Sequence, residues 1–143
     1  MSTPTSDTPW SLHPQLEHDT VPVGDLALSR LLAMNDVTYP WVVLVPRRRD
    51  AVEIIDLDAA EQTRLMGEIA EVSAALKRLT GCDKLNVGAI GNVVAQLHVH
   101  VVARRKDDPA WPRPVWGAAP ARPYAAGDLR SFVAALRGAV RLG

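Results

Sequence analysis

Polar and apolar residues alternate strictly from Gln96 to Val101, which predicts a half-buried β-strand over Gln96–Ala103. Because successive side chains of a strand point to opposite faces, we expect Gln96, His98 and His100 to project together from one face. The opposite face is apolar and can pack on a core; it consists of Leu97, Val99, Val101 and Ala103. The pattern therefore predicts two neighbouring imidazoles held on a rigid strand.

Shorter apolar runs upstream predict four further strands. These runs cover residues 21–23, 26–34, 41–45 and 84–90. Asn35–Pro40 is expected to form the turn between the second and third runs, and Pro46 ends the third run. We expect a Gly91-Asn92 turn to lead into the histidine strand. A short helical turn over His13–Asp19 is predicted to precede all of the strands.

Two longer segments have helical periodicity. Asp58 and Glu61 form a capping-box pattern, and the apolar stripe that follows is stopped by Gly81. That stripe consists of Leu65, Ile69, Val72, Leu76 and Leu79. A second, C-terminal stripe follows Gly127-Asp128 and consists of Leu129, Phe132, Val133, Leu136 and Val140. Runs of strands broken by one long helix predict an α+β fold with an antiparallel sheet.

Composition limits the class of protein. The chain has 143 residues, 48% of them hydrophobic, which fits one domain with a real core. Sixteen basic and sixteen acidic residues cancel, which argues against nucleic acid and membrane surfaces as partners. Cys82 is the single cysteine, and the N-terminus resembles no secretory signal, so we expect a cytoplasmic protein. No apolar stretch approaches the roughly 20 residues that span a bilayer.

We expect three regions along the chain. Residues 1–20 form a flexible N-terminal segment, residues 21–106 form the folded core, and residues 107–143 form a tail rich in proline and tryptophan that ends in a helix.

The two histidines on one strand face have three readings. A solvent-facing strand carries polar residues at every second position without any function. A His-x-His pair can also supply two ligands to zinc, but further ligands are then needed. Cys82 stands alone, and His13 and His18 lie in the N-terminal segment, so we predict no metal site. The third reading is catalytic.

The residues around this strand support the catalytic reading. Asn86-x-Gly88, Gly91-Asn92-x-Val94 and Gln96-x-His98-x-His100 follow one another in this order. This arrangement resembles the histidine triad (HIT) superfamily over roughly residues 20–106, with His98 at the middle histidine of its His-φ-His-φ-His motif. Gln96 replaces the first histidine, as in a bacterial Gln-x-His-x-His subgroup similar to diadenosine tetraphosphate hydrolase-like proteins. Val93 stands where Ser or Thr is frequent.

The resemblance implies a five-stranded antiparallel sheet, commonly paired as a homodimer, and a nucleotide substrate, with a purine nucleotide expected. It implies that His98 attacks an α-phosphate and forms a nucleotidyl-histidine, without an essential metal or other cofactor. The backbone carbonyl of Gln96 would hold one ring nitrogen of His98. His100, as an imidazolium, would donate to a phosphate oxygen or protonate the leaving group. The change from histidine to Gln96 is expected to alter the rate, pH dependence or leaving-group preference.

The resemblance also suggests residues that bind the substrate. Asn92 is expected to bond the α-phosphate, and Gly91 to allow close approach of the backbone. Asn86 is expected to bond phosphate or the catalytic strand, and Asn35 to contact the ribose. Each also fits an ordinary turn or a solvated strand position.

Aromatic and basic residues outside the motif have structural readings of their own. Trp41 stands about where relatives often have a histidine, and we expect it to pack in the core or beside the site. Trp111 and Trp116 can stack on a base or cover a partner subunit, but packing is the default reading. The basic runs 47–49 and 104–106 can attract polyphosphate, although such runs are more often solvated.

The sequence thus favours a nucleotide hydrolase or nucleotidyl transferase that works through His98. One alternative is a nucleotide-binding regulatory protein in which Gln96 marks lost turnover, and another is a His-x-His metalloprotein. The substrate and leaving group stay open, since dinucleoside polyphosphates, phosphoramidates, nucleotide sugars and aminoacyl adenylates all present an α-phosphate.

Overall fold

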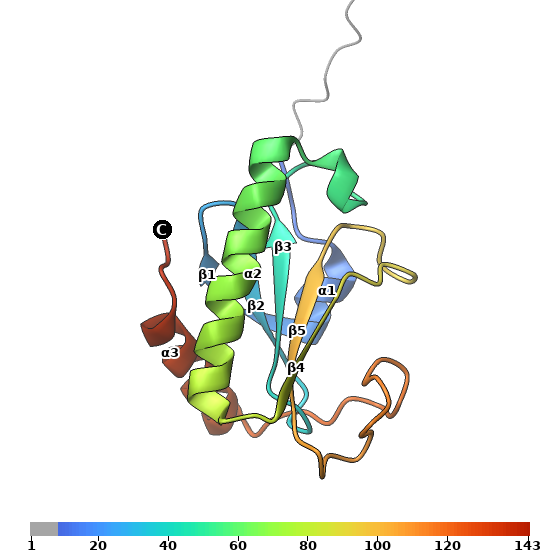
Figure 1. The fold of residues 1–143 in the computed structure, drawn as a ribbon, viewed down its shortest axis with the longest axis vertical. Coiled ribbons are helices and arrows are strands. Elements are labelled where there is room, and N and C mark those ends of the chain that lie inside the picture. The colour runs from blue at the N-terminus through green and yellow to red at the C-terminus, as the bar shows by residue number, and fades with distance from the viewer. Residues whose placement is uncertain (1–8) are drawn as a thin grey trace, which may run out of the picture.

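The computed structural model describes residues 9–143, which form a five-stranded antiparallel sheet with helices on both faces (Figure 1). The strands lie in the order β1-β2-β3-β5-β4. Their bounds are β1 (Thr20–Asp25), β2 (Ser29–Met34), β3 (Trp41–Pro46), β4 (Lys84–Gly88) and β5 (Val99–Arg104). The predicted α+β fold, with one long central helix and a C-terminal helix, is confirmed.

The N-terminal segment that was predicted to be flexible falls into two parts. Residues 1–8 lie outside the described residues. The short helix α1 (Pro14–Asp19) forms in the remainder, at the place where a helical turn was predicted.

Strand β5 is shorter than predicted, because it begins at Val99 and not at Gln96. It pairs with β3 up to the partners Leu44 and Val99. The ladder stops soon afterwards because Pro46, which ends β3, has no N–H to donate. The N–H of Leu97 donates instead to the carbonyl of Ala51, at 2.9 Å.

Helix α2 (Ala59–Thr80) begins and ends as its sequence predicts. The carboxylate of Asp58 accepts the N–H of Glu61, and the carboxylate of Glu61 accepts the N–H of Asp58. Gly81 ends the helix in the left-handed conformation, with φ 62°. The stripe packs as far as Leu76, while Leu79 in the last turn is 43% exposed.

Two apolar clusters lie on opposite faces of the sheet. The larger one joins the sheet to α2 and to α3 (Ala126–Ala139), and it includes the predicted apolar face of the histidine strand. The second joins the other face to α1 and to the tail, through Leu16, Trp41, Val43, Val102 and Val115. Figure 1 shows α2 in front of the sheet and α1 behind it.

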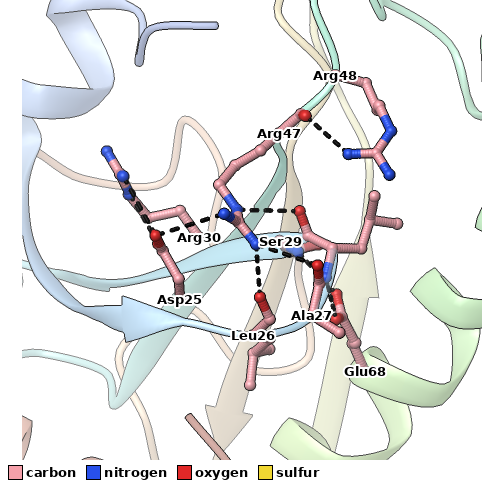
Figure 2. A network of polar contacts seen from close by, with 9 residues as sticks. Asp25, Leu26, Ala27, Ser29, Arg30, Arg47, Arg48 and Glu68 are labelled. Atoms are coloured by element: carbon pink, nitrogen blue, oxygen red, sulfur yellow. Dashed lines mark hydrogen bonds and ion pairs between the residues drawn. The ribbon is translucent and has the colours of Figure 1, made fainter. Parts of the chain in front are cut away.

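The basic run 47–49 has a structural role at the β1–β2 hairpin (Figure 2). Arg47 donates from Nη2 to the carbonyls of Leu26, at 2.7 Å, and Ala27, at 3.1 Å. The buried carboxylate of Glu68, on α2, accepts two backbone N–H groups of the same hairpin. Arg48 pairs with Glu61 at the start of α2. Arg47 and Arg48 therefore fasten the hairpin and the helix, and their charges are already partnered.

Within residues 9–143, no helix combines the length and apolar character needed to cross a membrane.

Candidate functional site

His98 and His100 lie side by side at the start of β5. His98 immediately precedes the strand and His100 is its second residue. Each is only 6% exposed, and their ring centroids are 4.8 Å apart with the rings nearly perpendicular. Both project from the sheet face that α1 and the tail cover. The predicted juxtaposition of two imidazoles on one face is confirmed.

The ring of His98 is fixed by a main-chain contact. Its Nδ1 lies 2.7 Å from the carbonyl oxygen of Gln96. Because a carbonyl only accepts, Nδ1 must carry the proton in this contact and Nε2 keeps its lone pair. This is the hydrogen bond that the family resemblance implied, and it leaves Nε2 as the ring nitrogen without a proton in the neutral ring.

The ring of His100 has the opposite arrangement. The indole Nε1–H of Trp41 donates to Nδ1 of His100 at 3.0 Å. The proton of a neutral His100 therefore resides on Nε2. Burial, and secondarily the electrostatic effect of the neighbouring His98, lower the pKa of His100 from its ordinary value to about 3. The expected imidazolium does not fit this position, because a protonated Nδ1 would point its proton at the Trp41 donor.

The side chain of Gln96 faces the N-terminal segment. Its Nε2 donates to the carbonyl of Ser11, and its Oε1 accepts the N–H of His13, both at 2.8 Å. Both ends of the amide are thus bonded to main chain that directly precedes α1. The Gln96 carbonyl contacts His98, as the resemblance implied, while the Gln96 side chain holds the segment before α1.

Gly91 and Asn92 lie beside His98, but not in a tight two-residue turn. They belong to the longer connection between β4 and β5, over residues 89–98. Gly91 has φ 68°, a left-handed conformation that favours glycine. Both residues are exposed and line the cavities that border His98.

The two other predicted binding residues, Asn35 and Asn86, lie in different parts of the structure. Asn35 lines the cavity over the histidines, and its Oδ1 accepts the N–H of Tyr124 at 2.9 Å. Asn86 bonds the strand that carries the histidines, since its Oδ1 accepts from Nη1 of Arg104 at 2.9 Å. The structure therefore brings Asn35 to the histidine cavity, whereas Asn86 is not among the residues that line it.

A cavity of about 630 Å³ lies over the two histidines. Four separate stretches of the chain form its walls: α1, the β2–β3 turn, the β4–β5 connection and the tail. Apolar side chains among its lining residues include Leu16, Met34, Ile90, Val94, Val115 and Trp116. The cavity is large enough for a small-molecule ligand and combines apolar walls with a few polar groups.

Asp36 is a lining residue that the sequence reasoning missed. It is 5% exposed, and its Oδ1 accepts the N–H groups of Thr38 and Arg122. The available signal was its place next to Asn35, in a turn that directly follows a strand.

A second cavity, of about 410 Å³, also borders His98. Its walls include Val52, Ile54 and Ile55 around the short 3-10 helix η1 (Ile54–Asp56), together with Ala89 and Ala95. His98 therefore borders two cavities, which also share Ile90, Gly91 and Asn92.

The tail over residues 107–125 is held by a buried ion pair. Arg104 is 1% exposed and makes two bonds to the carboxylate of Asp108, at 2.6 and 2.9 Å. Its guanidinium also lies over the rings of Tyr39 and Trp111. The expectation of a solvated or phosphate-binding cation is wrong for Arg104, because its donors are occupied inside the protein.

The tryptophans of the tail have different positions. Trp111 packs on Arg104, in agreement with the default reading. Trp116 lies against the ring of His100, with centroids 5.4 Å apart, and lines the histidine cavity.

In the part of the chain that the structure describes, no three His, Cys, Asp or Glu side chains gather in a way that could hold a metal ion. His13 and His18 lie on the N-terminal segment, where His13 caps α1 and His18 bonds Asp19.

Solved structures with the same fold come from several bacteria. A histidine triad protein from Bradyrhizobium japonicum is 54% identical, with a TM-score of 0.91 over 94% of this chain and 100% of that one. One from Sinorhizobium meliloti is 44% identical, with a TM-score of 0.90 over 92% and 97% of the two chains. One from Marinobacter aquaeolei is also 44% identical, with a TM-score of 0.89 over 92% and 96%. None of the curated proteins compared matches this chain.

The sequence pattern of the HIT domain matches residues 15–107, which is more than half of the chain. The matched region contains the whole sheet, α2 and both histidines. With two strongly similar histidine triad proteins of nearly equal length, this match shows that the chain belongs to the histidine triad family.

Proposed function

We propose that the protein is a nucleotide hydrolase or nucleotidyl transferase in which His98 attacks the α-phosphate of a bound nucleotide. The observation that carries this proposal is the bond from His98 Nδ1–H to the carbonyl of Gln96. It fixes the tautomer with a free lone pair on Nε2, in a buried ring that borders two cavities.

The first step forms a bond between Nε2 of His98 and the α-phosphorus. The bond from phosphorus to the leaving group breaks, and its electron pair departs with that group. The imidazole of the adduct is positively charged, and its Nδ1–H stays bonded to the Gln96 carbonyl, which stabilises the charge. In the second step a water molecule or another acceptor attacks phosphorus. The electron pair of the P–N bond returns to Nε2, and the proton of the attacking group passes to solvent.

The neighbouring residues have positioning roles in this scheme. His100 donates from its neutral Nε2–H to a phosphate oxygen, and the amide of Asn92 provides a second donor. Gly91 allows the backbone to approach the phosphate. Asn35 and Asp36 lie on the cavity wall formed by the β2–β3 turn and are assigned to the ribose side. Asn86 acts at one remove, by bonding Arg104 of the histidine strand.

The apolar part of the cavity is assigned to the nucleobase, with a purine expected. Val94, Val115 and Trp116 provide flat, apolar surface for a planar ring. We further propose a cytoplasmic homodimer, as the family resemblance implies, in which residues 21–106 act as the nucleotide-binding core.

The experiment incubates the purified protein with an adenosine phosphoramidate, a diadenosine polyphosphate and an ADP-sugar, and follows the release of AMP by chromatography. We expect release from at least one substrate, and His98→Ala should reduce it by on the order of 10⁶-fold, the scale for loss of a catalytic nucleophile. His13→Asn is the matched histidine control, because asparagine also caps a helix and His13 is not among the cavity-lining residues.

Other outcomes would overturn the proposal. Bound AMP with no release from any substrate would favour a nucleotide-binding regulatory protein, a reading consistent with Gln96 in place of the first motif histidine. Stoichiometric metal in elemental analysis would instead favour the His-x-His metalloprotein.

A further inference from the structure

The ring of His100 is enclosed between two tryptophans. Trp41 is 9% exposed, donates to His100 Nδ1 at 3.0 Å, and meets its ring edge-on with centroids 5.6 Å apart. Trp116 meets the same ring at 5.4 Å, but its own Nε1 is buried without a partner among the described residues. The two indoles are therefore similar in contact and different in hydrogen bonding.

The Trp41 bond permits only one protonation state of His100. An indole N–H is a donor and cannot accept, so Nδ1 of His100 must present its lone pair. Protonation at Nδ1 would break the bond and set two N–H groups against each other between buried side chains. The low pKa of His100, caused first by burial, agrees with this geometry.

We propose that Trp41 is a positioning residue that holds His100 as a neutral donor, so that the site favours leaving groups that depart without a proton. This inference rests on the proposed function and names its substrate class. The class is nucleoside 5′-phosphate anhydrides, in which the leaving group is a phosphate or a carboxylate.

The proton balance of the first step separates the substrate classes. In an anhydride the P–O bond breaks, and the electron pair leaves on an oxygen that is stable as a phosphate or carboxylate anion. In an alkyl phosphoramidate the P–N bond breaks, and the amine must gain a proton as it leaves. Neutral His100 can hold a phosphate oxygen through Nε2–H, but giving up that proton would leave an imidazolate. A general acid contributes about 10²–10⁴-fold to such a step.

Besides His98 and His100, three titratable groups line the histidine cavity: His18, Asp19 and Asp36. The ring of His18 contacts Asp19 Oδ1 at 3.0 Å, and Asp36 accepts two backbone N–H groups. His18 is thus the one other imidazole among the described lining residues that can bring a proton, so His18→Ala belongs in the experiment.

The test compares three adenosine 5′-phosphoryl substrates that differ in the leaving group: acetyl adenylate, ADP and an N-alkyl phosphoramidate. The initial rate of nucleotidyl-His98 formation is measured by rapid quench and mass spectrometry. We expect the better anhydride to exceed the phosphoramidate by about 10²–10⁴-fold, and the ratio between the two anhydrides identifies the carboxylate or the phosphate as the preferred leaving group. A phosphoramidate that reacts as fast as the anhydrides would overturn the inference.

Matched variants test the role of Trp41. Trp41→Phe keeps an aromatic ring and removes the donor that requires an unprotonated Nδ1 on His100, so the rate gap between anhydrides and phosphoramidate should narrow. Trp116→Phe removes an N–H that makes no bond to His100, so the substrate ratio should stay as in the wild type. Nitrogen-15 NMR of the imidazoles should show Nδ1 of His100 as an unprotonated acceptor in the wild type and in Trp116→Phe only. An equal ratio of anhydride to phosphoramidate rates in Trp41→Phe and Trp116→Phe would contradict the assignment to Trp41. A rise of this ratio in His18→Ala would show that His18, and not His100, supplies the proton to the leaving amine.

The two levels of proposal fail in different ways. No adduct on His98 with any of the three substrates would overturn the proposed function. Adducts with all three at similar rates would leave that function standing and overturn this inference alone. If Trp41→Phe does not fold, the wild-type substrate ratio and the wild-type NMR tautomer still decide.

Discussion

The two faces of the sheet are built in different ways. The face under α2 and α3 is packed by regular helices whose apolar stripes, and in α2 also the caps, follow from neighbouring residues. The other face is covered by α1 and the irregular tail, which are held by polar contacts between residues far apart in the sequence. The imidazoles lie on this second face. Periodic apolar packing thus stabilises the sheet on α2 and α3. Long-range polar contacts position α1 and the tail, which form walls of the histidine cavity.

The largest change in stability is expected at the buried pair that holds the tail. Asp108→Asn leaves Arg104 buried without its counter-charge, and we expect the free energy of unfolding to fall by about 3–5 kcal/mol. Urea unfolding followed by tryptophan fluorescence measures this. Asp107→Asn, an exposed neighbour, should change stability by less than about 0.5 kcal/mol. Equal losses in the two variants would show that the pair does not secure this face.

The same pair predicts how stability depends on acid. The hydrogen bond from Arg104 lowers the pKa of Asp108 in the folded state below its unfolded value. The stabilisation is therefore complete above the unfolded pKa and is lost as the pH falls through the folded pKa. We expect stability to fall in acid more steeply in the wild type than in Asp108→Asn, as measured by thermal unfolding at several pH values. Parallel profiles would rule out this coupling.

The helix-covered face is tested by a cavity-forming change in α2. Leu76 is fully buried, and Leu76→Ala is expected to cost about 2–5 kcal/mol of unfolding free energy. Leu79→Ala, at a site 43% exposed, should cost much less. Adduct formation on His98 per folded molecule should be unchanged in both variants. A loss of adduct formation in Leu76→Ala, but not in Leu79→Ala, would show that packing against α2 also determines the reactivity of His98 on the other face.

The two side-chain hydrogen bonds of Gln96 should contribute less to the free energy of unfolding. Gln96→Leu removes two hydrogen bonds to the N-terminal main chain, at a net cost of about 1–3 kcal/mol for the two. Backbone hydrogen exchange over residues 9–13 should rise, while Nδ1 of His98 stays protonated because the carbonyl of residue 96 is retained. Gln96→Glu keeps the acceptor for the N–H of His13 and loses the donor to Ser11. Its hydrogen exchange over residues 9–13 should therefore lie between the values for the wild type and for Gln96→Leu. A changed His98 tautomer in Gln96→Leu would contradict the separation of side-chain and main-chain roles.

The smallest effect is expected at the cap of α2. Asp58→Ala should cost about 1 kcal/mol, because the N–H of Glu61 loses its acceptor. Asp58→Asn retains a capping oxygen and should be nearly neutral in the same urea titration. A cost of several kcal/mol at this exposed position would show that the cap does more than close the helix.

What could be predicted from the sequence was local. The strands, the α2 caps and the shared face of His98 and His100 follow from periodicity and from neighbouring residues. The early end of the β5 ladder was not predicted, because it depends on Pro46 across the sheet.

The contacts that complete the site were also out of reach of local patterns. Trp41 and His100 are 59 positions apart, and Gln96 and Ser11 are 85 apart. Asp36 and the tail reach the cavity only when the whole chain is folded. Periodicity records which face a residue takes, but it does not record which distant residue it meets there.

The contact between His98 and residue 96 has a consequence for how sequence motifs are interpreted. The atom that holds the imidazole is a carbonyl oxygen, and every amino acid supplies one. A sequence motif compares side chains, so Gln96 counts as a mismatch to the first histidine. The contact with His98 is nevertheless made by the main-chain carbonyl of residue 96. A substitution there can therefore change how the segment before α1 is held, while the main-chain contact with His98 is kept.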